Sequence, residues 1–414
     1  MRAGSKQRWR IIAVAIALAM LSAPAPRALA EMVSDRSTPE LRIPADPSDF
    51  PDEAVGIRTG SFQWFPAART ALAYDSNLFA THGSRTAEGL SVTEATMTVA
   101  NTSSTLNVQG AGFVRARRFA KTGDQDTTEG GAALQLSTPD GLSNELTARL
   151  LANRRFESRT DIETPDIRAV SLYDEVRSEL DYRHTFNRFA VQPSLVAGRL
   201  DYSQASQQYR DRNYYRGELR TSYALTTDLA LIATGSYGRD EYRTASPLVA
   251  SADTGAALVG MRTEVPEVLE LELQAGYFRR HFDDNAGEIS GASVRGTLTM
   301  YPTRLMTLRA TLLREDEPTG IPGALAKVRT EASLEIQHEY SRNLKLFARG
   351  RRVVDDFEVV QRTDKAFQAE AGADYQLTTH WRVGLEYDYA NRNSADLGET
   401  FGRHLVSLTL IGRL

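Results

Sequence analysis

Hydrophobic and polar residues alternate along most of the chain after residue 62. The stretch KVRTEASLEIQHEY, residues 327–340, alternates throughout, with Leu334 and Ile336 on one face and Glu331 and Glu335 on the other. Successive side chains of a β-strand point to opposite faces of the sheet, whereas a helix repeats every 3.6 residues. The pattern therefore predicts a strand with one apolar face and one charged face.

The same alternation recurs in many stretches, among them 144–155, 269–280 and 381–392. Strands in soluble β-sandwiches usually have about five or six residues, whereas a tilted strand needs about ten residues to cross a bilayer. We count about eighteen such strands between residue 63 and the C-terminus. Sixteen is the alternative, because the stretches 128–137 and 250–264 are rich in small residues and give the weakest strand signal.

Short and long connections alternate between these strands. The segments 226–228 and 378–380 are short, whereas 240–251, 314–324 and 391–401 are longer and polar. Tight periplasmic turns and long extracellular loops are typical of outer-membrane barrels, and a sheet in lipid must close because an open edge leaves backbone groups unpaired. We therefore predict an all-β, transmembrane, antiparallel up-and-down β-barrel with both termini in the periplasm.

Aromatic residues recur eight positions apart on three predicted apolar faces. Eight residues of a tilted strand span roughly 20 Å along the membrane normal, close to the distance between two aromatic girdles. The alternative is that tyrosine is simply common in strands. The predicted girdle residues are Tyr74, Tyr215, Tyr223, Tyr277, Tyr301, Tyr340, Phe367, Tyr375, Trp381 and Tyr389.

Charged residues of both signs occupy the faces opposite the apolar ones, so they would line the lumen. Rings of charge set the selectivity of pores, but side chains on neighbouring strands can also pair and merely fill a polar interior. Both interpretations stay open from the sequence. The candidates are Arg115, Arg117, Arg149, Arg177, Arg216, Arg220, Glu270, Glu272, Arg329, Glu331, Glu335, Arg349, Arg351, Glu386 and Asp388.

The N-terminus has the composition of a secretory signal peptide. Residues 1–30 carry basic residues, then a short apolar run, then Ala28 and Ala30 around a small-residue cleavage site. The apolar run is too short for a membrane anchor, which needs about 20 residues. We predict export through the Sec route to the cell outer membrane, followed by a proline-rich disordered periplasmic segment over 31–60 and the barrel over 61–414.

Composition excludes some classes of function. The chain has no cysteine, so no disulfide framework supports it. Loss of the five positive charges of the signal peptide would take the net charge from −4 to −9. An acidic exported chain argues against nucleic acid as a partner.

The stretch GSFQWFPAARTALAYDSNLFAT, residues 60–81, resembles the opening strand of the second putative beta-barrel porin family of Gram-negative bacteria. The matching motif is a tyrosine, an aspartate and an asparagine followed by aliphatic and aromatic residues, here Tyr74, Asp75, Asn77 and their neighbours. The resemblance implies an outer-membrane barrel of the kind often associated with extracellular-polysaccharide export. It supplies no catalytic residues and no cofactor.

The segment YDSNLF, residues 74–79, has two interpretations. An aspartate and an asparagine two positions apart could bind an ion, or Asp75, Ser76 and Asn77 could form a turn in which their side chains bond to the local backbone. We favour the turn. The six histidines lack the pattern of a nucleophile with its base, so we predict neither an enzyme, nor a metal site, nor a cofactor.

Two functions of different classes remain. One is a porin-like barrel for the passive or gated passage of small hydrophilic solutes across the outer membrane. The other is a non-conducting or accessory barrel that partners polysaccharide-export components. In both cases the barrel contacts outer-membrane lipid, and its C-terminal strand, 404–414, is the signal that we expect the barrel-assembly machinery to recognise.

Overall fold

The computed structural model describes residues 56–414, except for 102, 104, 140, 161–169, 245, 247, 284–285, 361 and 396–398. The predicted signal peptide, 1–30, lies outside the described residues, as does most of the predicted disordered segment, 31–60. Residues 57–59 of that segment form a short strand on the edge of the barrel. Part of the stretch that the sequence suggested as disordered is therefore a strand.

The described residues form nineteen strands and two short 3-10 helices, η2 (Gly123–Gln125) and η3 (Ala205–Arg210). Eighteen of the strands have eleven residues or more, and the first has three. The strands are β1 (Ile57–Thr59), β2 (Phe62–Asp75), β3 (Glu88–Asn101), β4 (Asn107–Phe119), β5 (Thr127–Ser137), β6 (Asn144–Phe156), β7 (Leu172–Phe186), β8 (Phe189–Tyr202), β9 (Arg212–Ala224), β10 (Leu229–Tyr242), β11 (Ala252–Val265), β12 (Leu269–Phe282), β13 (Glu288–Thr303), β14 (Met306–Glu317), β15 (Lys327–Ser341), β16 (Leu344–Phe357), β17 (Arg362–Gln376), β18 (Trp381–Ser394) and β19 (Phe401–Arg413).

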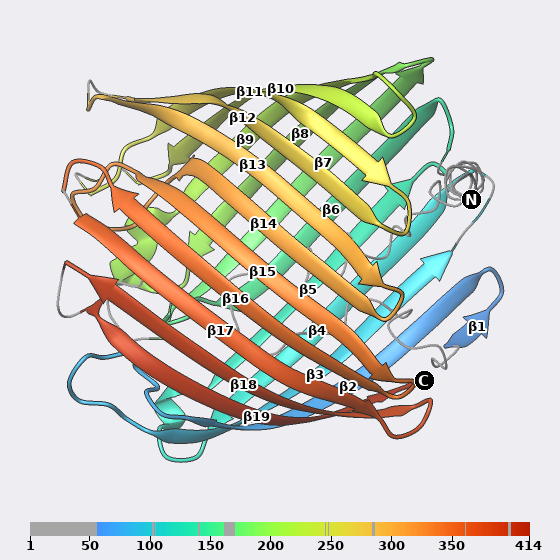
Figure 1. Ribbon diagram of the computed structural model, residues 1–414. Coiled ribbons are helices and arrows are strands. Elements are labelled where there is room, and N and C mark those ends of the chain that lie inside the picture. Colours follow the sequence, from blue (N-terminus) through green and yellow to red (C-terminus); the bar gives the residue numbers. More distant parts are fainter. Residues whose placement is uncertain are drawn as a thin grey trace, which may run out of the picture.

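Strands β2 to β19 form one closed antiparallel barrel (Figure 1). Each strand pairs with its neighbours in sequence, and the last strand, β19, pairs with the first, β2, from Leu405↔Asp75 to Arg413↔Ala67. The predicted up-and-down barrel of eighteen strands is confirmed. The two weak stretches, which became β5 and β11, form full ladders with both neighbours, so the alternative of sixteen strands is wrong. No helix among the described residues is long and apolar enough to cross a membrane.

The two faces of the wall differ as the alternation predicted. Outward-pointing apolar side chains such as Leu150 and Val259 are 57% and 68% exposed, because only lipid would cover them. Inward-pointing charged side chains such as Arg280 and Asp240 are each 1% exposed. A soluble protein buries its apolar side chains and exposes its charged ones. This barrel does the reverse, as expected when hydrocarbon replaces water around it.

Several strands continue into segments that the sequence suggested as loops. Strand β10 reaches Tyr242, β14 reaches Glu317, β16 reaches Phe357 and β18 reaches Ser394. These ends are rich in charged residues, which the alternation of apolar residues does not mark. Their charges pair across strands, for example Arg329 with Asp355 at 2.8 Å, so the ladder extends beyond the apolar band.

The segment YDSNLF joins the first strand to the last. The Asp75 carboxylate is fully buried and accepts bonds from Arg403 Nε at 2.9 Å and Arg403 Nη2 at 2.6 Å. The backbone N–H of Asn77 donates to Asp75 Oδ1 at 2.9 Å, and that of Thr81 donates to Asn77 Oδ1 at 3.2 Å. These bonds form the predicted turn. Because Arg403 engages the carboxylate, the arrangement favours a clasp on the barrel seam over an ion site.

We predict that Asp75→Ala lowers the free energy of unfolding by about 3 kcal/mol, because it leaves the buried Arg403 guanidinium without its carboxylate. Urea titration of the barrel refolded in detergent would measure this. The matched control is Glu288→Ala, which breaks an exposed pair with Arg279 and should cost less than about 1 kcal/mol. Equal losses of unfolding free energy in the two variants would contradict a stabilising role for the contact between Asp75 and Arg403.

Candidate functional site

The candidate site is the inner wall, where arginines and carboxylates from different strands pair with one another. Arg220 on β9 makes a two-pronged contact with Glu272 on β12, at 2.7 and 2.6 Å. Arg149 on β6 bridges Glu179 at 2.8 Å and Asp181 at 2.9 Å, both on β7. Such charge-assisted bonds fix both the position and the orientation of the side chains.

The other predicted lumen residues join the same kind of network. Alternation places all fifteen on the inner face, and Glu270 is exposed there near the turn between β11 and β12. Glu386 and Asp388 belong to the acidic cluster described below. The remaining contacts are Arg115–Glu94 at 2.6 Å, Arg117–Glu129 at 3.4 Å, Arg177–Glu179 at 3.0 Å, Arg216–Asp240 at 2.8 Å, Arg329–Asp355 at 2.8 Å, Arg351–Glu331 at 2.7 Å and Arg349–Glu335 at 2.9 Å.

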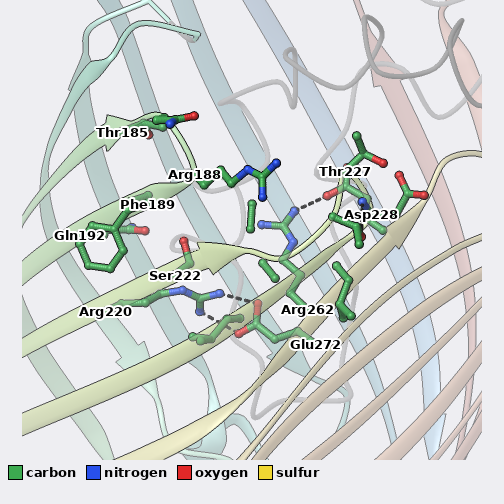
Figure 2. A pocket seen from close by; sticks show the side chains of 18 of the residues that line it. Thr185, Arg188, Phe189, Gln192, Arg220, Ser222, Thr227, Asp228, Arg262 and Glu272 are labelled. Atoms are coloured by element: carbon green, nitrogen blue, oxygen red, sulfur yellow. Dashed lines mark hydrogen bonds and ion pairs between the residues drawn. The ribbon is translucent and has the colours of Figure 1, made fainter.

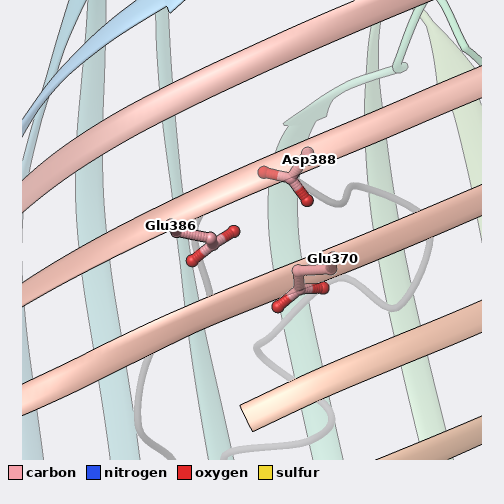
Figure 3. Close-up of side chains that lie close together, drawn as sticks. All are labelled: Glu370, Glu386 and Asp388. Carbon is pink, nitrogen blue, oxygen red and sulfur yellow. The ribbon is translucent and has the colours of Figure 1, made fainter. Parts of the chain in front are cut away.

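An acidic cluster lies on the wall between β17 and β18. Each of Glu370, Glu386 and Asp388 offers one carboxylate oxygen, and these oxygens lie within 4.8 Å of one another (Figure 3). Arg349 Nη1 lies 3.2 Å from Glu370 Oε2, and Arg349 Nη2 lies 2.9 Å from Glu335 Oε2. An arginine already contacts one of the three carboxylates, which favours a place in the ion-pair network over a metal site.

A polar cavity of about 500 Å³ opens on the inner wall near the periplasmic turns. It is lined by the turn that joins β7 to β8, the turn that joins β9 to β10, and parts of β11 and β12. Arg188, Arg220 and Arg262 surround it together with Asp228 and Glu272 (Figure 2). Sequence reasoning missed Arg188 and Asp228, because both lie in turns where no alternation marks a face.

Loops at the extracellular end of the barrel contact one another. Arg210 from the loop after β8 contacts Glu157 from the loop after β6, at 2.9 and 2.6 Å, and both side chains are buried. Tyr209 Oη donates to the carbonyl of Gly320, in the loop after β14, at 2.7 Å. Three loops far apart in the sequence are therefore tied together. No sequence signal identified these residues, because polar loop residues look alike until the loops are placed in space.

A buried ion triad lies beneath these loops. Arg280 on β12 donates to Asp240 on β10 at 2.8 Å and to Asp316 on β14 at 3.0 Å. Asp316 is on β14 beyond the last β13–β14 pair, Val294↔Arg314. The upper part of β14 is thus linked to β10 and β12 through Asp316, and to its neighbour β13 through the contact of Glu315 with Arg295 at 3.6 Å.

Apart from Tyr301, the predicted girdle residues point outward. Tyr74, Tyr277 and Tyr340 are 56%, 57% and 67% exposed. Tyr215, Tyr223, Phe367, Tyr375 and Trp381 are also exposed on the outer face, and Tyr389 is half-buried against His404. Tyr301 follows the outward-pointing Met300 in an irregular part of β13. The register shifts between Met300 and Thr303, so alternation does not determine the direction of the Tyr301 side chain, and its place in the girdle stays a prediction.

Comparison with known proteins identifies a family. The family model described as putative beta-barrel porin 2 matches residues 50–414. A comparison with curated proteins gave no match. The family match covers all eighteen barrel strands and β1.

Solved outer-membrane proteins give low similarity over most of the chain. A BenF-like porin from Pseudomonas fluorescens Pf-5 is 9% identical with a TM-score of 0.49, covering 86% of this chain and 99% of that one. OccK2 (OpdF) of Pseudomonas aeruginosa is 11% identical with a TM-score of 0.48, covering 85% and 97%. OccAB3 of Acinetobacter baumannii is 11% identical with a TM-score of 0.46, covering 86% and 100%.

We predict that Arg349→Gln makes the lumen more selective for cations. The change removes a positive charge among Glu335, Glu370, Glu386 and Asp388, so this part of the wall becomes more negative. The reversal potential of the reconstituted protein under a KCl gradient should shift toward the potassium equilibrium potential. Arg279→Gln, which alters an outward-facing arginine, should leave the reversal potential unchanged. A shift of the reversal potential toward the chloride equilibrium potential would contradict the placement of Arg349 in the lumen.

Proposed function

The chain belongs to the putative beta-barrel porin 2 family and is a porin-like β-barrel of the outer membrane, and we propose that it is a channel for small hydrophilic solutes. The observation that carries this proposal is the inner wall of paired arginines and carboxylates. Some of these pairs keep part of their side-chain surface accessible, as Arg220 and Glu272 do at 24% each, so water and polar solutes can reach them.

The paired wall also bears on selectivity. A ring of one sign concentrates counter-ions and excludes co-ions, whereas adjacent charges of opposite sign cancel over short distances. Arg220 with Glu272 and Arg149 with Glu179 and Asp181 are local pairs of this kind. We therefore propose weak charge selectivity, with solute size and polarity as the main criteria.

The tied loops at the extracellular end support gated passage. The contacts Arg210–Glu157 and Tyr209–Gly320 link loops that belong to separate parts of the wall. Loops opening on the microsecond-to-second scale are a common way to control access. The channel would then be narrow while these contacts hold and wider once they break.

The remaining features of the proposal concern export and assembly. We propose that residues 1–30 direct the chain to the Sec route, and that the C-terminal strand β19 is recognised by the barrel-assembly machinery. The channel would act without a cofactor and without catalysis. Partnership with polysaccharide-export components is the competing role.

We predict stable, ohmic single-channel steps when the purified protein is inserted into planar bilayers. Arg210→Gln should lengthen the open intervals, because it breaks the contact with Glu157. Arg118→Gln, at an exposed position near the extracellular end, is the matched control and should behave as the wild type does. A silent bilayer despite confirmed insertion would refute the channel and favour the accessory role.

A further inference from the structure

An apolar groove of about 690 Å³ crosses the outer face of the barrel over strands β5 to β10. Small residues form its floor, namely Ala148, Ser178, Ala197 and Gly217. Alternation points these four outward, so the groove faces lipid and not the lumen. Its volume falls within the roughly 300–1,000 Å³ of small-molecule sites.

Large apolar side chains stand beside this floor. Leu150, Leu180 and Leu195 are 57%, 44% and 59% exposed, and Leu134 and Leu136 continue the wall toward β5. A Cβ added to Gly217 would meet its nearest neighbour, Leu195, at 3.6 Å, an ordinary contact. The strands therefore do not need a glycine at position 217 in order to pack. The effect of Gly217 is to leave the groove open.

The groove rises toward the extracellular side. Its residues follow one row of paired positions, Leu150↔Ser178, Ser178↔Ala197 and Ala197↔Tyr215. The row ends at Tyr215↔Arg239, three residues before β10 ends. One end of the groove thus lies at mid-membrane depth, and the other lies beside the aromatic residues of the outer leaflet.

Arginines with carboxylates occupy the upper end. Arg199 follows the floor residue Ala197 on the outer face of β8, and its side chain is 53% exposed while it donates to Asp201 at 2.7 Å. Arg239 lines the groove and contacts Asp253 at 2.9 Å and Asp283 at 2.7 Å. Charged groups pointing out of the barrel at the girdle need a polar partner at the level of the lipid head groups.

We propose that this groove binds one phosphorylated glycolipid of the outer leaflet, with an acyl chain along the small-residue floor and a phosphate on Arg199 and Arg239. Guanidinium groups recognise phosphate through paired, charge-assisted bonds. The carboxylates of Asp201, Asp253 and Asp283 hold the arginines in place and can accept bonds from sugar hydroxyls, and Arg243, a second partner of Asp201, adds a third positive charge. The capacity to bind sugar hydroxyls favours a glycolipid over an ordinary phospholipid.

The test compares lipid retained by purified protein. Barrels extracted from outer membranes into a mild detergent are washed, and native mass spectrometry counts bound lipids by mass. The wild type should keep one phosphorylated glycolipid. Arg199→Gln, which removes a phosphate contact, should lower its occupancy about tenfold, the effect of losing one charge-assisted bond. Gly217→Leu, which fills the groove, should also lower it, because the acyl chain loses its place on the floor.

Two control variants separate a specific site from the general lipid annulus. Ala371→Leu adds the same bulk at an exposed outward position on β17, and Arg352→Gln removes an exposed arginine paired in register with the girdle residue Phe367. Both should retain the glycolipid, and all four variants should show the heat-dependent gel mobility of a folded barrel. Absence of the glycolipid from wild type, retention of phospholipid alone, or equal losses in test and control variants would overturn the proposal. None of these results depends on whether the barrel conducts.

Discussion

Closure of the backbone hydrogen-bond network is the constraint on which the rest of this structure depends. Hydrocarbon offers no partner to a backbone N–H or C=O, and each unsatisfied group costs several kcal/mol. A sheet in lipid is therefore stable only when its last strand meets its first. Here β19 meets β2, and the buried contact between Asp75 and Arg403 lies at one end of that seam.

Closure determines which side chains meet across the lumen wall. Because the register is continuous around the barrel, a charged residue on one strand faces fixed positions on its neighbours. Arg349 lies between Glu335 on β15 and Glu370 on β17, and both are its register partners. An arginine in that place without these carboxylates would be a desolvated charge. The balance of charge along the lumen is thus in part a requirement of folding, and the weak ion selectivity that we propose would be its consequence.

The sequence was sufficient for the features that depend on a period of two. Alternation in residues such as Leu334 and Glu335 predicted the strands, their two faces and their number. It did not predict where polar strands end, because β10 and β14 continue through charged residues that carry no apolar signal. It also does not determine the direction of Tyr301, because the register of β13 shifts between Met300 and Thr303.

Features that arise from register and loop placement could not be read from one sequence. The contact between Arg210 and Glu157 joins positions 53 residues apart, and that between Tyr209 and Gly320 joins positions 111 apart. Neither pair has a recurring spacing. The same holds for Asp75 and Arg403, 328 residues apart, which only closure of the barrel brings together.

Alternation also gives little information about individual residues on the outer face. Alternation treats all outward positions as equivalent, so Ala197, Gly217 and Leu195 carry the same prediction of lipid contact. Only the register places Ser178 and Ala197 in one row that leads through Tyr215 to Arg239, with Gly217 beside that row. On a uniform apolar band, no position binds a lipid more tightly than another. A groove with an apolar floor and a charged upper end would bind one lipid more tightly, because its chain is buried and its phosphate is paired at the same place.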